Sequence, residues 1–417
     1  MTVKKRLISM FARWYTSDKR RAKIYRRAEK KLLKRRKQGH GDCYLRADDP
    51  YSYLLSQVLP QFCEKYACEL RPIIVTHLED SCYPERQLLA DYALEDCQRL
   101  ARAYNLEPPV KRSSLSEKAS LVLCEAAQGS HPWKAIAAIF KSLWVAHTAI
   151  PGIQSANIPI LQQQLTDNNT VMIKRGHYLT AMIEYAGEKY WGIDRLHYLE
   201  RRLTDGELLF PSPDQNNFTG TADSGKGKVL SCYFSFRSPY SYILLTRLFA
   251  LADHYQCELE LKPILPMVMR GLSVPTSKRL YILLDAKREA NRHDIPFGYI
   301  SDPLGKGVEN ALALFYVAKN MGKEREYVLA MTKASWSKAI DISNLKNLRS
   351  LCHELALDWP SCESALMSEN WRDFAEMNRQ EIYEYGLWGV PAMIIDSLVV
   401  WGQDRLWMVD QHLSRGQ

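Results

Sequence analysis

The sequence lacks the signatures of several common classes of protein. Its 417 residues include ten cysteines but no C-x-x-C pair, and no Cys/His group has zinc-finger spacing, so neither a metal site nor a dithiol centre is predicted. No apolar run is long enough to cross a bilayer, and the basic N-terminus lacks the apolar stretch of a secretory signal. We therefore expect a cytoplasmic chain with reduced cysteines, folded into two or three domains.

The positive charge is concentrated in residues 1–40, which hold sixteen Lys and Arg against two acidic residues, a net charge of +14. Apolar residues recur at helical spacing between them: Leu7, Phe11, Trp14, Tyr25, Ala28 and Leu32. The pattern predicts one or two basic amphipathic helices. They either attach to an anionic surface, nucleic acid or acidic lipid, or pack their aromatic stripe against the chain itself.

The rest of the chain contains an internal repeat. "DPYSY" at Asp49 corresponds to "SPYSY" at Ser238, at an offset of 189 residues. Towards the end of each half the offset grows to about 210, where "AMI" at Ala181 is aligned with "AMI" at Ala392. Segments 1–40 (basic extension), 41–210 (first domain), 211–228 (a linker rich in Pro, Gly, Asn and Ser) and 229–417 (second domain) follow from this repeat.

Each half shows the same order of elements. In the second half, "KVLSCYFSF", "SYILLTRLFALADHY" and "CELELKPIL" are typical of a strand, a helix and a strand. A mostly helical stretch over 277–385 follows, and "PAMIID" and "LVVWG" predict a hairpin around Asp396 and Ser397. The predicted class is α/β: two tandem thioredoxin-like domains, each with an inserted helical subdomain, after a basic helical N-terminal extension.

Three motifs carry a family resemblance. "YFSFRSPYSYILL", "WGVPAMIID" and "VVWGQDRL", in this order and spacing, resemble the 2-hydroxychromene-2-carboxylate isomerase and kappa-class glutathione transferase family of the DsbA-type thioredoxin-like superfamily. The resemblance covers residues 229–417 closely, residues 41–205 more loosely, and the basic extension not at all. Ser235 departs from the pattern, because the family usually has Asp there.

The resemblance implies glutathione as the cofactor. It implies that Ser238, at the place of the first redox Cys of DsbA-type oxidoreductases, activates the glutathione thiol, and that Val390-Pro391 is a cis-proline turn that pairs with the glutathione cysteine. It further implies that the Trp401–Asp404 segment holds the γ-glutamyl end. The implied cofactor-binding residues are Val390, Pro391, Trp401, Gly402, Gln403 and Asp404.

The chemistry of Ser238 agrees with this role. A thiol with a pKa near ~8.5 is mostly protonated at neutral pH, and one hydrogen bond to the thiolate is worth roughly 1.5–3 kcal/mol. The N-terminus of a helix adds a favourable dipole. Ser before Pro is also an ordinary helix cap, so the assignment depends on the two other motifs.

Substrate-binding residues are harder to identify. The family has a basic group and an aromatic residue at the start of the helical insertion, and Lys278 and Tyr281 are the candidates here. The alternatives are a solvated helix face for Lys278 and core packing for Tyr281. Spacing of i, i+3 also predicts two ion pairs on helix surfaces, Asp285 with Arg288 and Asp96 with Arg99.

The first half departs from the motif at chemically informative positions. Asp49 stands in the place of Ser238, and a carboxylate about 4 Å from a thiolate repels it by ~4 kcal/mol at an effective dielectric near 20. Thr180 is aligned with Pro391, and a cis bond before a non-proline residue costs roughly 2.5–4 kcal/mol. We expect a non-catalytic copy that packs on, shields or positions the second half. The alternative is a site for another ligand at Asp49.

The favoured function is a glutathione-dependent isomerase or transferase acting on a small aromatic or conjugated keto-acid substrate. The thiol would add reversibly and allow a bond to rotate before it leaves. The alternative is a pair of non-catalytic binding modules tethered by the basic extension. A thiol-disulfide oxidoreductase is disfavoured because Ser238 and Ser241 occupy both C-x-x-C positions. Kappa-like enzymes tend to dimerise, so we expect a homodimer unless the two halves replace it.

Overall fold

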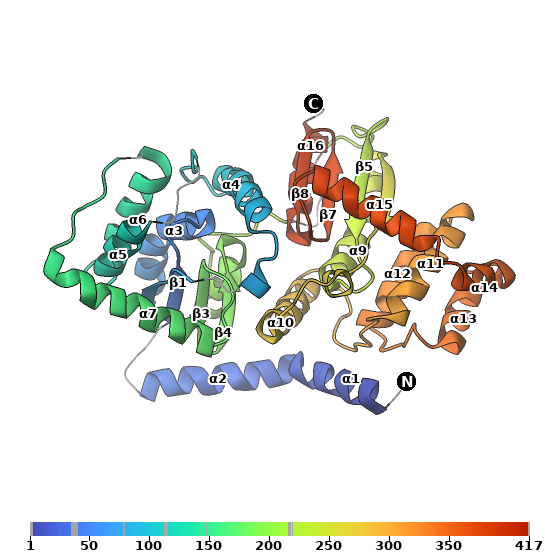
Figure 1. Cartoon of the computed structure of the whole chain (residues 1–417), viewed down its shortest axis with the longest axis horizontal. Coiled ribbons are helices and arrows are strands. Elements are labelled where there is room, and N and C mark those ends of the chain that lie inside the picture. The colour runs from blue at the N-terminus through green and yellow to red at the C-terminus, as the bar shows by residue number, and fades with distance from the viewer. Residues whose placement is uncertain are drawn as a thin grey trace. The chain divides into compact units, whose positions relative to one another are not determined.

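The computed structural model describes residues 3–34, 41–77, 80–111, 116–146, 148–215, 218 and 220–415. They divide into two compact units: the N-terminal unit, residues 22–213 with 275–278, and the C-terminal unit, residues 1–21, 214–274 and 279–417 (Figure 1). The ends of the basic extension and three residues of the segment 211–228 lie outside the described residues. No described helix is both long and apolar enough to cross a membrane.

The basic extension forms two helices, as its periodicity predicts. They are α1 (Val3–Tyr15) and α2 (Asp18–Lys34). The hydroxyl of Thr16 donates to the carbonyl of Ala12 at 2.8 Å, which satisfies one of the carbonyls left open at the end of α1. The whole of α1 belongs to the C-terminal unit.

The N-terminal unit is built on a four-stranded sheet with the order β2-β1-β3-β4. Strand β1 is parallel to β2 and antiparallel to β3. Its elements are β1 (Gly41–Leu45), α3 (Pro50–Tyr66), β2 (Leu70–Ile74), η1 (Asp80–Cys82), α4 (Arg86–Ala103), α5 (Glu117–Ala126), α6 (Pro132–Lys141), η2 (Ser142–Ala146), η3 (Ser155–Asn157), α7 (Ile158–Lys174), β3 (Met182–Tyr185), β4 (Glu188–Trp191), η4 (Ile193–Arg195) and α8 (Leu196–Leu203).

The C-terminal unit has a four-stranded sheet of the same topology, with the order β6-β5-β7-β8. Strand β5 is again parallel to one neighbour and antiparallel to the other. The elements are β5 (Val229–Phe234), α9 (Pro239–Tyr255), β6 (Glu258–Pro263), η5 (Met267–Arg270), α10 (Thr276–Arg292), α11 (Lys306–Asn320), α12 (Glu324–Trp336), α13 (Leu345–Glu354), α14 (Trp359–Met367), α15 (Trp371–Glu384), β7 (Ala392–Ile395), β8 (Leu398–Trp401), η6 (Gln403–Arg405) and α16 (Leu406–Ser414).

The α/β class, the βαβ unit and the closing hairpin of the C-terminal unit are confirmed. Helices α10 to α15 fill the predicted insertion between β6 and β7. Ile395 pairs with Leu398, so Asp396 and Ser397 form a two-residue turn. Asp396 has φ of 51°, in the left-handed region that such turns require.

The two hairpins correspond at an offset of 210 residues throughout. Strand β3 pairs Met182 with Trp191, and β7 pairs Ala392 with Trp401. The sequence alignment placed Met182 opposite Met393 and is therefore wrong by one residue. The reason is that "AMI" occurs in both halves but begins one residue before β3 and at the first residue of β7.

This correction changes which residue replaces the proline. Ala181 directly precedes β3, as Pro391 directly precedes β7. Ala181, and not Thr180, therefore stands at the position of Pro391, and Thr180 corresponds to Val390. The first half still lacks the proline.

The two predicted surface ion pairs are not on the surface. Arg288 contacts Asp285 at 2.5 Å, but both side chains are buried. Asp96 is fully buried, and Arg99 pairs with Glu95 at 3.2 Å. Spacing of i, i+3 finds a pair on a helix but does not reveal which face packs against another element.

Candidate functional site at the end of β5

Ser238 caps α9. Strand β5 ends at Phe234, and a short turn leads to Ser238, whose Oγ accepts from the N–H of Ser241 at 3.1 Å. Pro239 follows at the first helical position, where its missing N–H costs nothing. The Ser238 side chain is half-buried at the N-terminus of a helix, where exposed N–H groups and the helix dipole favour a bound anion.

The register of the sheet brings the Val390-Pro391 turn to the same edge. Tyr233, next to the last residue of β5, pairs with Ala392, the first residue of β7. Pro391 therefore lies at the end of β5 from which the turn to Ser238 leads. The Val390–Pro391 bond is cis, as predicted, and no other cis bond occurs among the residues that the structure describes.

The end of β8 is joined to this turn. The N–H of Gly402 donates to the carbonyl of Pro391 at 2.9 Å. A Cβ at Gly389 would lie 2.6 Å from the ring of Trp401, so the indole approaches the turn as closely as a glycine permits. The rings of Trp388 and Trp401 lie 4.6 Å apart, centroid to centroid. Three separate motifs of the sequence thus meet at one edge of the sheet.

Gln403 differs from its neighbours in the Trp401–Asp404 segment. Its side chain is buried, and its Nε2 donates to Oε2 of Glu289 at 2.7 Å while its Oε1 accepts from Arg247 at 3.4 Å. Asp404 keeps 14% of its side chain exposed, 3.5 Å from Arg405. The amide of Gln403 therefore takes part in an internal network, and the carboxylate of Asp404 is the more accessible group.

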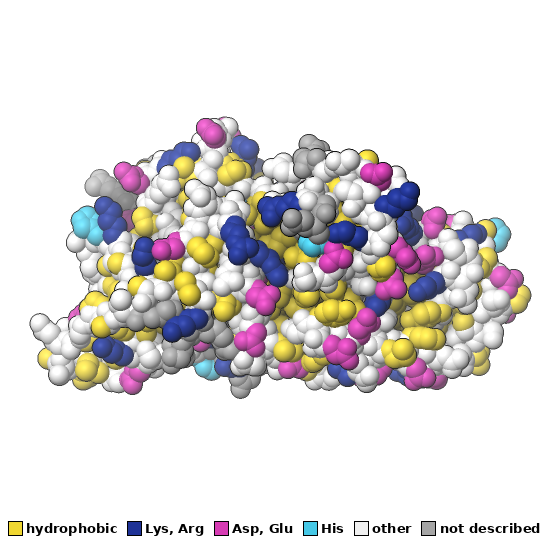
Figure 2. All heavy atoms as spheres, turned by 90° about the horizontal axis from the view of Figure 1, so that it is seen from above, with side chains coloured by type: hydrophobic (Ala, Val, Ile, Leu, Met, Phe, Trp, Pro, Cys, Tyr) yellow, Lys and Arg dark blue, Asp and Glu magenta, His cyan; other side chains and the backbone are white. Residues whose placement is uncertain are grey.

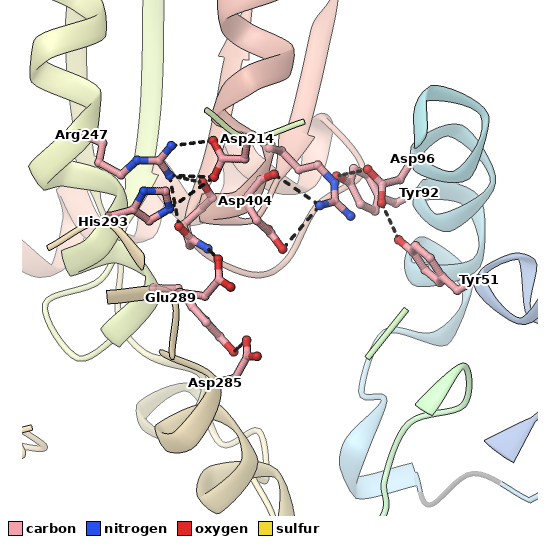
Figure 3. Close-up of polar contacts among 12 residues, drawn as sticks. Tyr51, Tyr92, Asp96, Asp214, Arg247, Asp285, Glu289, His293 and Asp404 are labelled. Carbon is pink, nitrogen blue, oxygen red and sulfur yellow. Dashed lines mark hydrogen bonds and ion pairs between the residues drawn. The ribbon is translucent and has the colours of Figure 1, made fainter. Parts of the chain in front are cut away.

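The internal network includes a residue from the predicted linker. Arg247 of α9 donates to both carboxylate oxygens of Asp214, at 3.0 and 2.5 Å, and His293 lies 3.5 Å from the same carboxylate (Figure 3). Burial acts to raise the pKa of Asp214, but the hydrogen bonds and positive charge of these partners outweigh it and lower the pKa to about 2. Asp214 is therefore ionised and integral to the C-terminal unit.

The two substrate-side candidates are placed differently. Lys278 falls in the segment 275–278 that is assigned to the N-terminal unit, where its ammonium donates to the carbonyl of Cys82 at 3.0 Å. Burial lowers its pKa, so a solvated helix face is wrong for this residue. Tyr281 is buried, as its core-packing alternative requires. Lys278 thus groups with the N-terminal unit, not with the edge at Ser238.

Sequence reasoning missed Arg270. This residue ends η5, shortly after β6, and its Nη2 donates to the carbonyl of Trp388 at 2.9 Å, within the turn that leads to Pro391. Burial lowers the pKa of its guanidinium below the usual value. The only signal in the sequence is a lone basic residue in "PMVMRG", a stretch without periodicity.

The N-terminal unit has a carboxylate at the equivalent position. Asp49 caps α3, accepting from the N–H of Tyr51 at 3.1 Å, and its second oxygen accepts from Ser52 at 2.6 Å and from Thr180 at 2.7 Å. Burial raises the pKa of Asp49. The residues at the positions of Ser238 and Val390 therefore bind each other, and a cavity of about 240 Å³ remains beside them.

The C-terminal half is similar to a described protein family. Residues 229–414 match the family model described as the DSBA-like thioredoxin domain. The match begins at the first residue of β5 and ends in α16, so it covers the sheet, the helical insertion and the edge at Ser238.

The similar proteins with curated descriptions are isomerases. The 2-hydroxychromene-2-carboxylate isomerase of Sphingobium xenophagum is 25% identical over 194 residues, which cover 45% of this chain and 98% of that protein. The isomerase of the same description from Pseudomonas putida is 26% identical over 196 residues, 45% of this chain and 95% of that protein. A solved 2-hydroxychromene-2-carboxylate isomerase aligns with a TM-score of 0.40 at 23% identity, covering 45% and 95% of the two chains.

Proposed function

We propose that the C-terminal unit is a glutathione-dependent isomerase or transferase in which Ser238 activates the glutathione thiol. The observation that carries this proposal is the half-buried Ser238 hydroxyl at the N-terminus of α9, on the same sheet edge as the cis Val390–Pro391 bond. The similarity to proteins described as 2-hydroxychromene-2-carboxylate isomerases supports an isomerisation.

The hydrogen bonds of Ser238 suit a donor to a thiolate. Its Oγ accepts from Ser241, so the hydroxyl proton is left to point towards an incoming anion. One such bond, worth roughly 1.5–3 kcal/mol, lowers the pKa of the thiol by about one to two. A substantial fraction of bound glutathione would then be thiolate at neutral pH.

The other residues of the edge would hold glutathione. The backbone of Val390, before the cis Pro391, would pair with the cysteine of glutathione, and the face of Trp401 would form an apolar wall. The carboxylate of Asp404 would bind the γ-glutamyl ammonium group. Gly402 would hold the turn through its N–H bond to the carbonyl of Pro391, and Gln403 would act through its internal network.

The reaction follows from a thiolate held at this edge. The sulfur adds to a conjugated carbon of a small aromatic or keto-acid substrate, and the former double bond becomes a single bond that rotates. The thiolate then leaves and the double bond forms again, so glutathione is neither oxidised nor consumed. The half-buried guanidinium of Arg270 is suited to bind the substrate carboxylate.

The N-terminal unit would be a diverged, non-catalytic copy that arose by tandem duplication. Both sheets have the same strand order. In each unit the helix after the first strand is joined to the insertion by a hydrogen bond of 2.8 Å, from Tyr51 to Asp96 and from Tyr240 to Asp285. The two tyrosines are 189 positions apart in the sequence, and so are the two aspartates.

The proposal is tested by titrating glutathione into the whole chain by calorimetry and by following thiolate absorbance of the bound cofactor against pH. The wild type is expected to lower the pKa of the thiol by about one to two, and Ser238→Ala to abolish this change. Asp49→Ala is the matched control at the equivalent helix cap and should leave both measurements unchanged. Glutathione binding and turnover that survive in Ser238→Ala would contradict the proposal.

A further inference from the structure

Helix α1 turns its apolar stripe outward. Four side chains at helical spacing are exposed by about half or more: Leu7 61%, Met10 67%, Phe11 48% and Trp14 55%. The rings of Phe11 and Trp14 lie 5.9 Å apart, so the stripe is continuous along the helix. An exposed aliphatic and aromatic stripe of this size is unusual unless another surface covers it.

The helix is held to the C-terminal unit by its other face. Ala12 is buried in a hydrophobic cluster that includes Tyr242, Ala290 and Phe297. The guanidinium of Arg13 lies 4.1 Å above the centroid of the Tyr299 ring. The opposite face of α1 therefore docks on the C-terminal unit, while Leu7, Phe11 and Trp14 stay about half exposed or more.

Positive charge flanks the stripe. Arg6 and Arg13 belong to α1, which has no acidic residue. Residues 1–40 carry a net charge of +14 against −5 for the remainder, since the whole chain carries +9. The guanidinium of Arg20 lies 3.8 Å above the ring of Trp14. On the face of the molecule drawn in Figure 2, Lys and Arg are interspersed with Asp and Glu.

We propose that α1 attaches the protein to an anionic lipid surface. The helix would lie in the plane of the interface, with Leu7, Phe11 and Trp14 between the acyl chains and its Lys and Arg side chains at the headgroup phosphates. Nucleic acid fits less well, because Leu7 and Met10 have no aromatic ring on which a base could stack. Attachment would deliver the C-terminal unit to substrates that partition into membranes.

The test is co-sedimentation of the whole chain with vesicles of phosphatidylcholine and phosphatidylserine, compared with phosphatidylcholine alone. The wild type should bind the anionic vesicles, less tightly as salt is raised. The double variant Phe11→Ser/Trp14→Ser should lose tenfold or more in apparent affinity. The matched control is Met367→Ser/Met377→Ser, which removes two apolar side chains of the same unit that are more exposed, 88% and 62%, and it should bind as the wild type does.

Two outcomes would overturn the inference. One is no sedimentation of the wild type with anionic vesicles. The other is that the wild type and Phe11→Ser/Trp14→Ser bind vesicles equally and both also retain duplex DNA. Contacts with phosphate groups would then account for the binding without the apolar stripe. Circular dichroism and thermal unfolding of each variant establish that it is folded, so a loss of vesicle binding reports on the stripe.

Discussion

The helices that follow the first strand of each unit, α3 and α9, differ mainly in what their capping side chains bind. Both span 17 residues and begin with proline. Two hydroxyls, of Ser52 and Thr180, donate to the Asp49 carboxylate, whereas the Ser238 side chain accepts from the backbone N–H of Ser241. A helix N-terminus is thus common to both units, but in the N-terminal unit the protein's own carboxylate occupies it. If Ser238 binds the glutathione thiol as proposed, this one residue and its partners decide whether the helix dipole acts on a ligand or on the protein's own side chain.

The largest effect is expected from transferring this carboxylate to the C-terminal unit. Ser238→Asp would place a negative charge beside the glutathione thiolate and raise its pKa by about three, since ~4 kcal/mol of repulsion is expected at about 4 Å. Turnover should fall about a thousandfold. Asp49→Ser, the reverse change in the other unit, should leave turnover unaltered. Wild-type turnover in Ser238→Asp would mean that the thiolate lies elsewhere.

The next effect concerns the indole at the cis-proline turn. Gly389→Ala would bring a Cβ to 2.6 Å from the Trp401 ring and displace it, and misplacing a binding group by about 1 Å can cost up to 100-fold in rate. Gly152→Ala in the N-terminal unit is the control, because a Cβ there meets nothing within 4 Å. Turnover measured against glutathione concentration would compare the two variants. Equal values for the two variants would exclude Trp401 from the site.

The units should respond to acid in opposite directions. The pKa of Asp214 is lowered to about 2, so its stabilisation, about 2–3 kcal/mol, is complete above the unfolded pKa near 4 and is lost as pH falls towards 2. The pKa of Asp49 is raised by burial, so its ionised form disfavours folding. The N-terminal unit therefore gains stability as pH falls through the raised pKa of this carboxyl group.

Thermal unfolding against pH of Asp214→Asn and Asp49→Asn would measure this contrast. Asp214→Asn should flatten the acid limb of the profile for the C-terminal unit, and Asp49→Asn should remove the gain of the N-terminal unit at mildly acidic pH. Parallel profiles for the two variants would contradict the opposite signs.

The smallest effect tests whether the shared framework contributes equally in both units. Tyr51→Phe removes the hydrogen bond that the tyrosine hydroxyl donates to the buried carboxylate of Asp96. Tyr240→Phe removes the equivalent bond to Asp285. Each should cost about 1.5 kcal/mol of unfolding free energy, at the low end for a bond to a charged group because Asp285 keeps its contact with Arg288. Denaturant unfolding of the two variants measures the costs, and a loss confined to one unit would count against the common framework.

The sequence predicted the helices and strands, and the meeting of three motifs at the sheet edge near Ser238, better than it predicted the partners of individual side chains. Strand alternation and helical periodicity are local, so the βαβ unit, the insertion and the hairpin at Asp396 were found. Register depends on backbone pairing between distant strands, which is why Thr180 was placed one residue away from its position. The partners of Gln403, Asp214 and Arg270 lie more than 30 residues away in the sequence, and no spacing rule reports such contacts.

The anchoring of Asp214 has a consequence for how the chain can be dissected. The part that matches the DSBA-like family model begins at Val229, yet Asp214, fifteen residues earlier, fills a buried position beside Arg247. A fragment that starts at Val229 would leave that guanidinium in the interior without its counter-ion, at a cost of about 3–5 kcal/mol. The segment that matches the family model is therefore not self-sufficient, because a residue of the stretch before it is a structural component of the same unit.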